Sequence, residues 1–284
     1  MTRAPKIMEA QLFINGLALG ESPRWRDGRL WFSDWIAGEI VAVDLQGRRE
    51  VILRFNSFPF SLDWLPDGTL LVVNEARILR QDADGALTTY ADLSNLCDKP
   101  LNEIVVDGRG FAYANTIGFD FPGGAFAPGL VAVVSPDGTV RRVAGGVAFP
   151  NGMAVTPDNG TLILAESYGK KLTAFDIGAD GRLSNQRLWA DLGDGVPDGI
   201  CIDAEGAVWY ADVPNRRCVR VREGGETLNV VNTDRGCFSC ALGGPERSTL
   251  FIVAAEWRGA DATSMTRAGQ VLTAAAPAPG AGWP

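Results

Sequence analysis

The 284-residue sequence contains no histidine at all. Histidine is the general base of the Ser-His-Asp and Cys-His mechanisms, and it is also the commonest ligand of hydrolytic zinc. Its absence excludes these mechanisms and the His-rich zinc sites. Catalysis by this chain therefore has to use carboxylates, amides, hydroxyls or a metal ion.

Cysteine is scarce and odd in number. Five cysteines in a chain long enough to build its own core favour free thiols over a disulfide framework. Cys237 and Cys240 form one CxxC motif, but without a second pair or a histidine it cannot make an ordinary structural zinc site. We expect free thiols, with a disulfide or redox pair as the alternative.

The sequence has no apolar run of about 18 residues, which excludes a membrane-spanning helix. The N-terminus, MTRAPKIMEAQLF, lacks the continuous apolar core of a secretory signal, so a cytoplasmic location is expected. Acidic residues outnumber basic ones by 34 to 26, which disfavours nucleic acid as a partner. With 46% hydrophobic residues, the composition indicates a soluble domain, either a monomer or a weak homo-oligomer.

What the chain does have is one unit repeated six times: a polar residue, an apolar run, a tight turn and a second apolar run. The copies occupy residues 21–35, 61–75, 102–116, 151–167, 198–212 and 239–257. Their turns centre near Gly28, Gly68, Gly108, Gly160 and Gly206, which are 40, 40, 52 and 46 residues apart. A period of this length is typical of a β-propeller.

Each copy predicts a β-hairpin, because Asp-Gly turns supply the positive φ that a tight hairpin needs. The segments between copies, such as 38–55 and 171–190, predict a second hairpin, so each repeat makes a four-stranded blade. The sequence therefore predicts an all-β, six-bladed propeller over residues 1–272, closed by the strand 10–16. The Ala/Pro/Gly-rich end, 273–284, is expected to be a flexible tail or a final strap.

The first residue of each copy begins an inner strand and should point into the central channel. These residues are Glu21, Ser61, Asn102, Asn151, Asp198 and Ser239. Glu21, Asn151 and Asp198 offer two carboxylates and an amide, which are hard oxygen ligands for Ca²⁺, Mg²⁺ or Mn²⁺. Asn102 either adds a fourth oxygen or contacts a substrate. The alternative is that these groups only solvate a water-filled channel.

Four segments of these copies resemble the senescence marker protein 30/gluconolactonase/luciferin-regenerating enzyme family. They are GESPRW, NEIVVDGRGFAYANT, FPNGMAVTPDNGTLILAES and PDGICIDAEGAVWYAD, in that order within residues 15–257. The resemblance implies a six-bladed propeller with one divalent cation in its channel, held by Glu21, Asn151 and Asp198. Ca²⁺ is the first choice, with Mg²⁺, Mn²⁺, Zn²⁺ or Fe²⁺ as alternatives. Asn102 matches a polar residue that faces substrate or metal.

The sequence departs from many sugar lactonases of this family around Asn102. Those members carry Arg two residues before the Asn and Asp directly after it, and both can contact substrate hydroxyls. Here Pro100 and Glu103 occupy these positions. Glu103 is thus a candidate substrate contact, and loss of the Arg fork favours a less polar γ- or δ-lactone.

The longest interval between turns contains the segment IGFDFPGGAFAPG, residues 117–129, which is expected to be a loop over the channel mouth. Phe119, Phe121 and Phe126 are candidates to line an apolar pocket there, with Asp120 as its charge. Packing of these phenylalanines between blades is the alternative.

The resemblance and the oxygen ligands together predict a metal-dependent lactonase. The cation would polarise the carbonyl, and Asp198 would accept the proton of the attacking water, with a water activated by the cation itself as the alternative. Two further hypotheses remain open: a phosphotriester or fluorophosphonate hydrolase, and a non-catalytic propeller that binds calcium or a protein partner.

Overall fold

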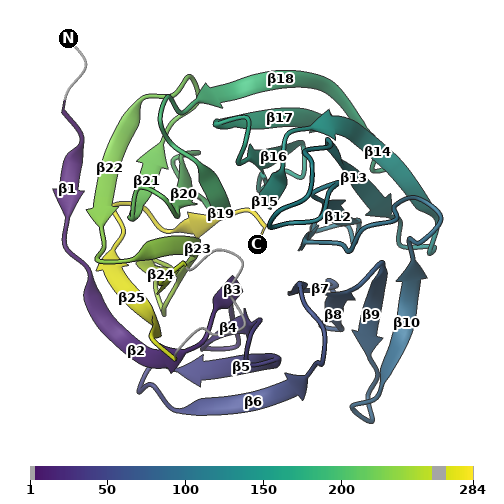
Figure 1. Ribbon diagram of the computed structural model, residues 1–284, viewed down its shortest axis with the longest axis horizontal. Coiled ribbons are helices and arrows are strands. Elements are labelled where there is room, and N and C mark those ends of the chain that lie inside the picture. The colour runs from purple at the N-terminus through teal and green to yellow at the C-terminus, as the bar shows by residue number, and fades with distance from the viewer. Residues whose placement is uncertain (1–3, 258–266, 284) are drawn as a thin grey trace.

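The computed structural model describes residues 4–257 and 267–283, and every regular element in this part of the chain is a β-strand. The described residues include no helix that is long and apolar enough to cross a membrane. The strands form six sheets, which are arranged as a ring around a central axis (Figure 1). The predicted six-bladed propeller is confirmed.

Each blade is an antiparallel sheet whose first strand lies beside the axis. Blade 1 consists of β3 (Gly20–Arg26), β4 (Arg29–Asp34), β5 (Glu39–Asp44) and β6 (Arg49–Arg54). Blade 2 consists of β7 (Phe60–Trp64), β8 (Leu70–Asn74), β9 (Arg77–Gln81) and β10 (Leu87–Asp92). Blade 3 consists of β11 (Glu103–Val106), β12 (Ala112–Thr116), β13 (Gly129–Val134) and β14 (Val140–Val147).

The remaining blades follow the same order, and the last one uses a strand from the other end of the chain. Blade 4 consists of β15 (Pro150–Val155), β16 (Thr161–Glu166), β17 (Lys171–Ile177) and β18 (Leu183–Asp191). Blade 5 consists of β19 (Pro197–Asp203), β20 (Val208–Asp212), β21 (Arg217–Val221) and β22 (Thr227–Asn232). Blade 6 consists of β23 (Gly236–Gly243), β24 (Thr249–Ala255), β25 (Gly269–Ala275) and β2 (Gln11–Leu17).

The ring is closed by β2, which pairs with β25 at the outer edge of blade 6. This is the closing role expected for residues 10–16. A short strand, β1 (Lys6–Met8), continues the N-terminus along the outer edge of blade 5 and pairs in parallel with β22. The joint between the chain ends therefore rests on hydrogen bonds to two neighbouring blades.

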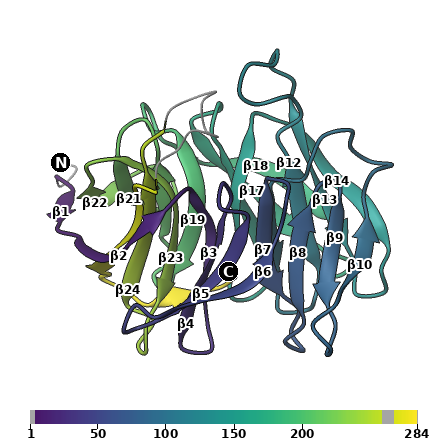
Figure 2. The ribbon, with the colours of Figure 1, turned by 60° about the horizontal axis from the view of Figure 1, so that its bottom comes forward.

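The C-terminal residues form a strap under the propeller. The predicted boundary at residue 272 falls inside β25, and β26 (Gly280–Ala281) pairs with the far end of β19, at Ile202 and Asp203. Trp283 then pairs with Val155 of blade 4. Figure 2 shows this yellow segment at the bottom of the ring. The strap thus connects blades 4 and 5 at the end of the channel opposite the copies' first residues.

A hydrophobic cluster fills each of the six interfaces between neighbouring blades. The cluster between blades 5 and 6 contains Cys201, Cys218, Cys237 and Cys240, and all five cysteines of the chain are buried and free. Burial raises the pKa of Cys240 well above the usual thiol range, so this thiol stays protonated. The CxxC motif therefore belongs to the core.

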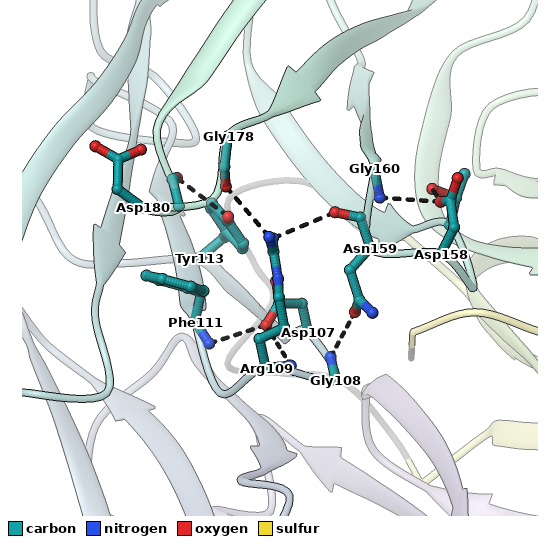
Figure 3. A network of polar contacts seen from close by, with 12 residues as sticks. Asp107, Gly108, Arg109, Phe111, Tyr113, Asp158, Asn159, Gly160, Gly178 and Asp180 are labelled. Atoms are coloured by element: carbon teal, nitrogen blue, oxygen red, sulfur yellow. Dashed lines mark hydrogen bonds and ion pairs between the residues drawn. The ribbon is translucent and has the colours of Figure 1, made fainter.

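Polar contacts also join neighbouring blades at the bottom of the ring, as Figure 3 shows between blades 3 and 4. The guanidinium of Arg109 pairs with Asp107 at 2.7 Å and donates to the carbonyl oxygens of Gly178 and Asn159, both at 3.2 Å. The Asn159 side chain accepts from the backbone N–H of Gly108 at 2.7 Å. These hydrogen bonds pair polar groups in the turns of blade 3 with polar groups in the turns of blade 4. They fix the relative position of the two blades.

Candidate active site

A cavity of about 750 Å³ opens at the end of the channel where the inner strands begin, and residues from blades 1, 3, 4, 5 and 6 and from the loop that leads into blade 2 line it. Four of the six predicted channel residues are among them: Glu21, Asn102, Asn151 and Asp198. Ser61 and Ser239 are outside the lining and almost fully buried between strands. The structure thus brings together four polar side chains from blades 1, 3, 4 and 5 and leaves the two serines apart.

Backbone irregularities aim three of these side chains inward. The pairing of β3 with β4 shifts register between Glu21 and Arg24, and the inner strands of blades 4 and 5 shift at the corresponding places, beside Asn151 and Asp198. A β-bulge adds a residue to one strand and redirects the side chains beside it. The three predicted metal ligands therefore share one local backbone feature.

Glycine brings the inner strands of blades 4 to 6 close together. A Cβ on Gly152 would lie 2.6 Å from the nitrogen of Ile200, and a Cβ on Gly199 would overlap Ser239 Oγ. No other residue type permits this approach. Because each glycine directly follows a predicted ligand, the same contacts that fix the strands also bring Asn151 and Asp198 together at the axis.

The two carboxylates at the base of the cavity repel each other. Burial raises the pKa of Glu21 well above its ordinary value, and the nearby charge of Asp198 adds to this effect. Burial also raises the pKa of Asp198, followed by repulsion from Glu103, while a hydrogen bond from Asn151 opposes the shift. Among the described residues, neither Glu21 nor Asp198 has an ion-pair partner, unlike Glu103 with Arg24.

The donor set fits a divalent cation. Asp198 Oδ1 is buried without a hydrogen-bond partner among the described residues, which is costly for a carboxylate unless a cation or proton binds it. Glu21, Asp198 and the amide oxygen of Asn151 are the hard oxygen ligands that Ca²⁺ and Mg²⁺ prefer. The described residues contain no cluster of three or more His, Cys, Asp or Glu with metal-binding geometry, so such a site depends on the Asn151 amide.

A layer of hydrogen bonds beneath the candidate ligands holds Asn151. The backbone carbonyl oxygen of Asn151 accepts from Asn115 Nδ2 at 2.7 Å, and the side-chain Nδ2 of Asn151 lies 3.4 Å from Ser167 Oγ. Ser167 in turn donates to the carbonyl of Pro197, directly before Asp198, at 2.7 Å. These hydrogen bonds fix Asn151 against blade 4 and link it to the backbone beside Asp198, the candidate ligand from blade 5.

The structure separates the two candidate substrate contacts on blade 3. Asn102 lines the cavity, and its Nδ2 lies 3.4 Å from the carbonyl oxygen of Pro150. Glu103 is outside the lining, because its Oε1 accepts from Ser22 Oγ at 2.9 Å and from Arg24 Nη2 at 3.2 Å. Pro100 is exposed and also lies outside the lining.

The loop 117–129 lies at the cavity mouth, as expected, but its phenylalanines have different roles. Phe121 lines the cavity, whereas Phe119 is buried behind it and packs edge-on against Phe121 with ring centroids 6.2 Å apart. Phe126 is exposed outside the cavity and contacts Phe119. Asp120 is bound by Lys99 at 2.7 Å on the surface. Of the three candidate phenylalanines, Phe121 reaches the cavity directly, Phe119 supports it, and Phe126 lies outside.

Several lining residues were not singled out from the sequence. They are mostly apolar residues within three positions of an end of a repeat copy: Phe58, Ile117, Tyr168, Val213, Phe238 and Trp257. The antiparallel hairpin returns each copy to the mouth where it started, for example by pairing Pro197 with Asp212. The positions at the ends of the copies were therefore a usable signal for part of the cavity wall.

Comparisons with known proteins agree with this architecture. The chain is 29% identical to regucalcin of Xenopus laevis over 252 residues, covering 84% of this chain and 83% of the relative. It is 25% identical to the pentonolactonase XacC of Haloferax volcanii, covering 84% and 81%. A crystal structure of the calcium-binding protein regucalcin from Agrobacterium tumefaciens matches with a TM-score of 0.80 at 23% identity, covering 98% and 97%.

The family model described as "SMP-30/Gluconolactonase/LRE-like region" matches residues 19–256, from just before the first repeat copy to the last residue but one of the sixth. That range contains all four polar residues at the base of the cavity. The chain therefore belongs to the SMP-30/gluconolactonase/LRE-like family.

Proposed function

We propose that this protein is a divalent-cation-dependent hydrolase that opens the ring of a small-molecule lactone. The observation that carries the proposal is the pair of largely buried carboxylates, Glu21 and Asp198, without a cationic partner among the described residues, at the base of a large cavity. The lactonase name of one relative supports the choice of lactones within the wider class of esters.

Glu21, Asn151 and Asp198 are the residues that would hold the cation. When bound, a divalent cation polarises a carbonyl and stabilises the negative charge that develops on its oxygen during attack by water. Its charge also balances the two carboxylates, whose mutual repulsion is otherwise uncompensated.

The chain itself supplies proton transfer and orientation. We assign the proton of the attacking water to Asp198, through the carboxylate oxygen that would not hold the cation. The water oxygen bonds to the carbonyl carbon, the ring C–O bond breaks, and the departing alkoxide takes up a proton to give a hydroxy acid. Asn102, from blade 3, offers an amide to orient the ring.

The test is turnover of a lactone panel with metal-stripped protein and with single cations added back. We expect hydrolysis of at least one lactone only when a divalent cation is present, after correction for spontaneous ring opening. Hydrolysis of phosphotriesters but of no lactone would move the protein to another hydrolase class. Cation binding without turnover of either class would make it a binding protein.

A further inference from the structure

Five aromatic side chains from three blades form a continuous row over the cavity, which we call the aromatic arch. Its members are Phe238, Trp257, Phe121, Phe149 and Tyr168, and all five line the cavity. Neighbouring ring centroids along the row are 6.0, 5.9, 5.0 and 4.8 Å apart. Each ring is thus within contact distance of the next.

The middle of the arch crosses the channel axis. Phe121 follows β12 of blade 3, and Trp257 follows β24 of blade 6, which is the opposite blade in a ring of six. Their rings are stacked with an interplanar angle of 10°. Two side chains from opposite walls therefore meet above the base of the cavity that contains Glu21 and Asp198.

The arch contains both buried and partly exposed rings. Phe149 and Phe238 are buried, whereas Phe121 and Trp257 remain 41% and 39% exposed. Phe119 packs behind Phe121 and fixes it from the side away from the cavity. Large apolar surface that stays exposed in a cavity is surface that a ligand can cover.

We propose, building on the lactonase function above, that the preferred substrate is a lactone with an alkyl or aryl substituent that packs against the aromatic arch. The lactone ring lies at the base, near Asp198 and Asn102, and the substituent extends toward Phe121 and Trp257. The hydroxyls of a polyhydroxylated sugar lactone that lay against the faces of these two rings would lose water, and the ring faces offer no hydrogen bonds in return. Phe121 and Trp257 are specificity-determining residues in this arrangement.

The test compares γ-nonanoic lactone, γ-butyrolactone and glucono-δ-lactone. For the wild-type protein we expect kcat/KM to be at least tenfold higher for γ-nonanoic lactone than for γ-butyrolactone, and at least equal to that for glucono-δ-lactone. Phe121→Ala and Trp257→Ala should each lower the nonanoic-to-butyro ratio at least threefold.

Leu188→Ala is the control, because Leu188 is exposed on blade 4 and lies outside the cavity lining. It should leave the ratio unchanged. A ratio near one in the wild-type protein, a strong preference for glucono-δ-lactone, or a ratio unaffected by Phe121→Ala would overturn the inference while leaving the lactonase function intact.

A binding measurement separates the arch from the chemistry. The γ-pentyl lactam is an unhydrolysable analogue of γ-nonanoic lactone, and its affinity can be measured by calorimetry without any turnover. We expect tighter binding than for unsubstituted pyrrolidinone, and loss of this difference in Phe121→Ala. Lactam binding without hydrolysis of any lactone would reject the proposed function but keep the apolar site, whereas equal binding of both lactams would reject the site.

Discussion

Arg24 and Glu103 form a buried ion pair beneath the cavity, with 3.2 Å between Arg24 Nη2 and Glu103 Oε1. Both side chains are less than one-tenth exposed. Arg24 also donates to the carbonyl of Ile104 at 2.7 Å, so the pair joins the inner strands of blades 1 and 3. It compensates the charge of Glu103 and leaves Glu21 and Asp198 as the carboxylates available to a cation.

The buried ion pair predicts a large loss of stability when Arg24 is replaced by an uncharged residue. Arg24→Met should lower the free energy of unfolding by about 3–5 kcal/mol, because it leaves Glu103 buried and without its charged partner. Urea unfolding measures the difference. Arg29→Met is the matched control, since Arg29 pairs with Glu50 on the surface and should cost at most about 1 kcal/mol. Equal effects of the two changes would contradict the structural role given to Arg24.

The two remaining carboxylates predict bound metal. Protein prepared without chelator should contain about one equivalent of a divalent cation, and EDTA should lower both turnover and the melting temperature through loss of native-state binding. Elemental analysis and thermal unfolding provide the measurements. Metal-free protein with full turnover and an unchanged melting temperature would refute the site.

Replacing the proposed base separates proton transfer from binding. Asp198→Asn keeps an oxygen at the site but cannot accept the proton, so kcat should fall by a factor of roughly 10² or more at saturating cation. Asn102→Ala should chiefly raise KM, because the amide orients the substrate. Near wild-type kcat in Asp198→Asn would transfer the role of base to another group.

Asp63 predicts a pH dependence of stability that is separate from the site. Burial is the largest influence on this carboxyl and raises its pKa from 3.8 to about 6, despite Arg24 nearby and the N–H of Val106 at 2.7 Å. A folded-state pKa above the unfolded value contributes stability at low pH that is lost as the pH rises through about 6. Relative to Asp63→Asn, the wild-type protein should therefore lose about 2–3 kcal/mol between pH 4 and pH 7.

The matched control for this pH series is Asp67→Asn in the same blade. The N–H and hydroxyl of Thr69 hold the pKa of Asp67 below its usual value, so its contribution is present at neutral pH and lost on acidification. The two variants should thus change the pH profile in opposite directions. Parallel profiles for Asp63→Asn and the wild-type protein would mean that Asp63 is not the group responsible.

The repeat made the fold and the base of the site predictable. A polar residue at the start of each copy lies beside the axis in every blade, so the sequence pattern alone was enough to group Glu21, Asn151 and Asp198. The repeat could not show which of the equivalent residues are covered by a neighbouring strand and so kept out of the cavity. Ser239 fails to reach the cavity because the chain at Gly199 passes directly against it.

The cavity wall was harder to predict, because it depends on contacts between distant blades. Glu103 directly follows the cavity residue Asn102, yet Ser22 and Arg24 of blade 1 turn it away from the cavity. The pairing of Phe121 with Trp257 likewise joins residues 136 positions apart in the sequence. Neither contact leaves a local pattern in the sequence.

The C-terminal strap leads to the last prediction, which concerns stability alone. The backbone of Trp283 exchanges two hydrogen bonds with Val155, and the N–H of Ala204 donates to the carbonyl of Pro279 at 2.8 Å. Removal of residues 277–284 should lower the free energy of unfolding by about 2–5 kcal/mol, at about 1 kcal/mol for each lost hydrogen bond plus the packing of Trp283. Because the strap is at the opposite end of the channel from Asp198, kcat and KM below the melting temperature should be unchanged.

A pair of glycine variants tests the strap without shortening the chain. Gly282 and Gly206 have φ values of +67° and +73°, so alanine carries a similar conformational cost at both positions. A Cβ on Gly282 would overlap the carbonyl oxygen of Val155, whereas nothing lies within 4 Å of one on Gly206. Gly282→Ala should therefore lower the melting temperature more than Gly206→Ala and approach the truncated protein. If the two variants melt together while the truncation is strongly destabilised, the stabilisation comes from the residues before Gly282 and not from the pairing of Trp283 with Val155.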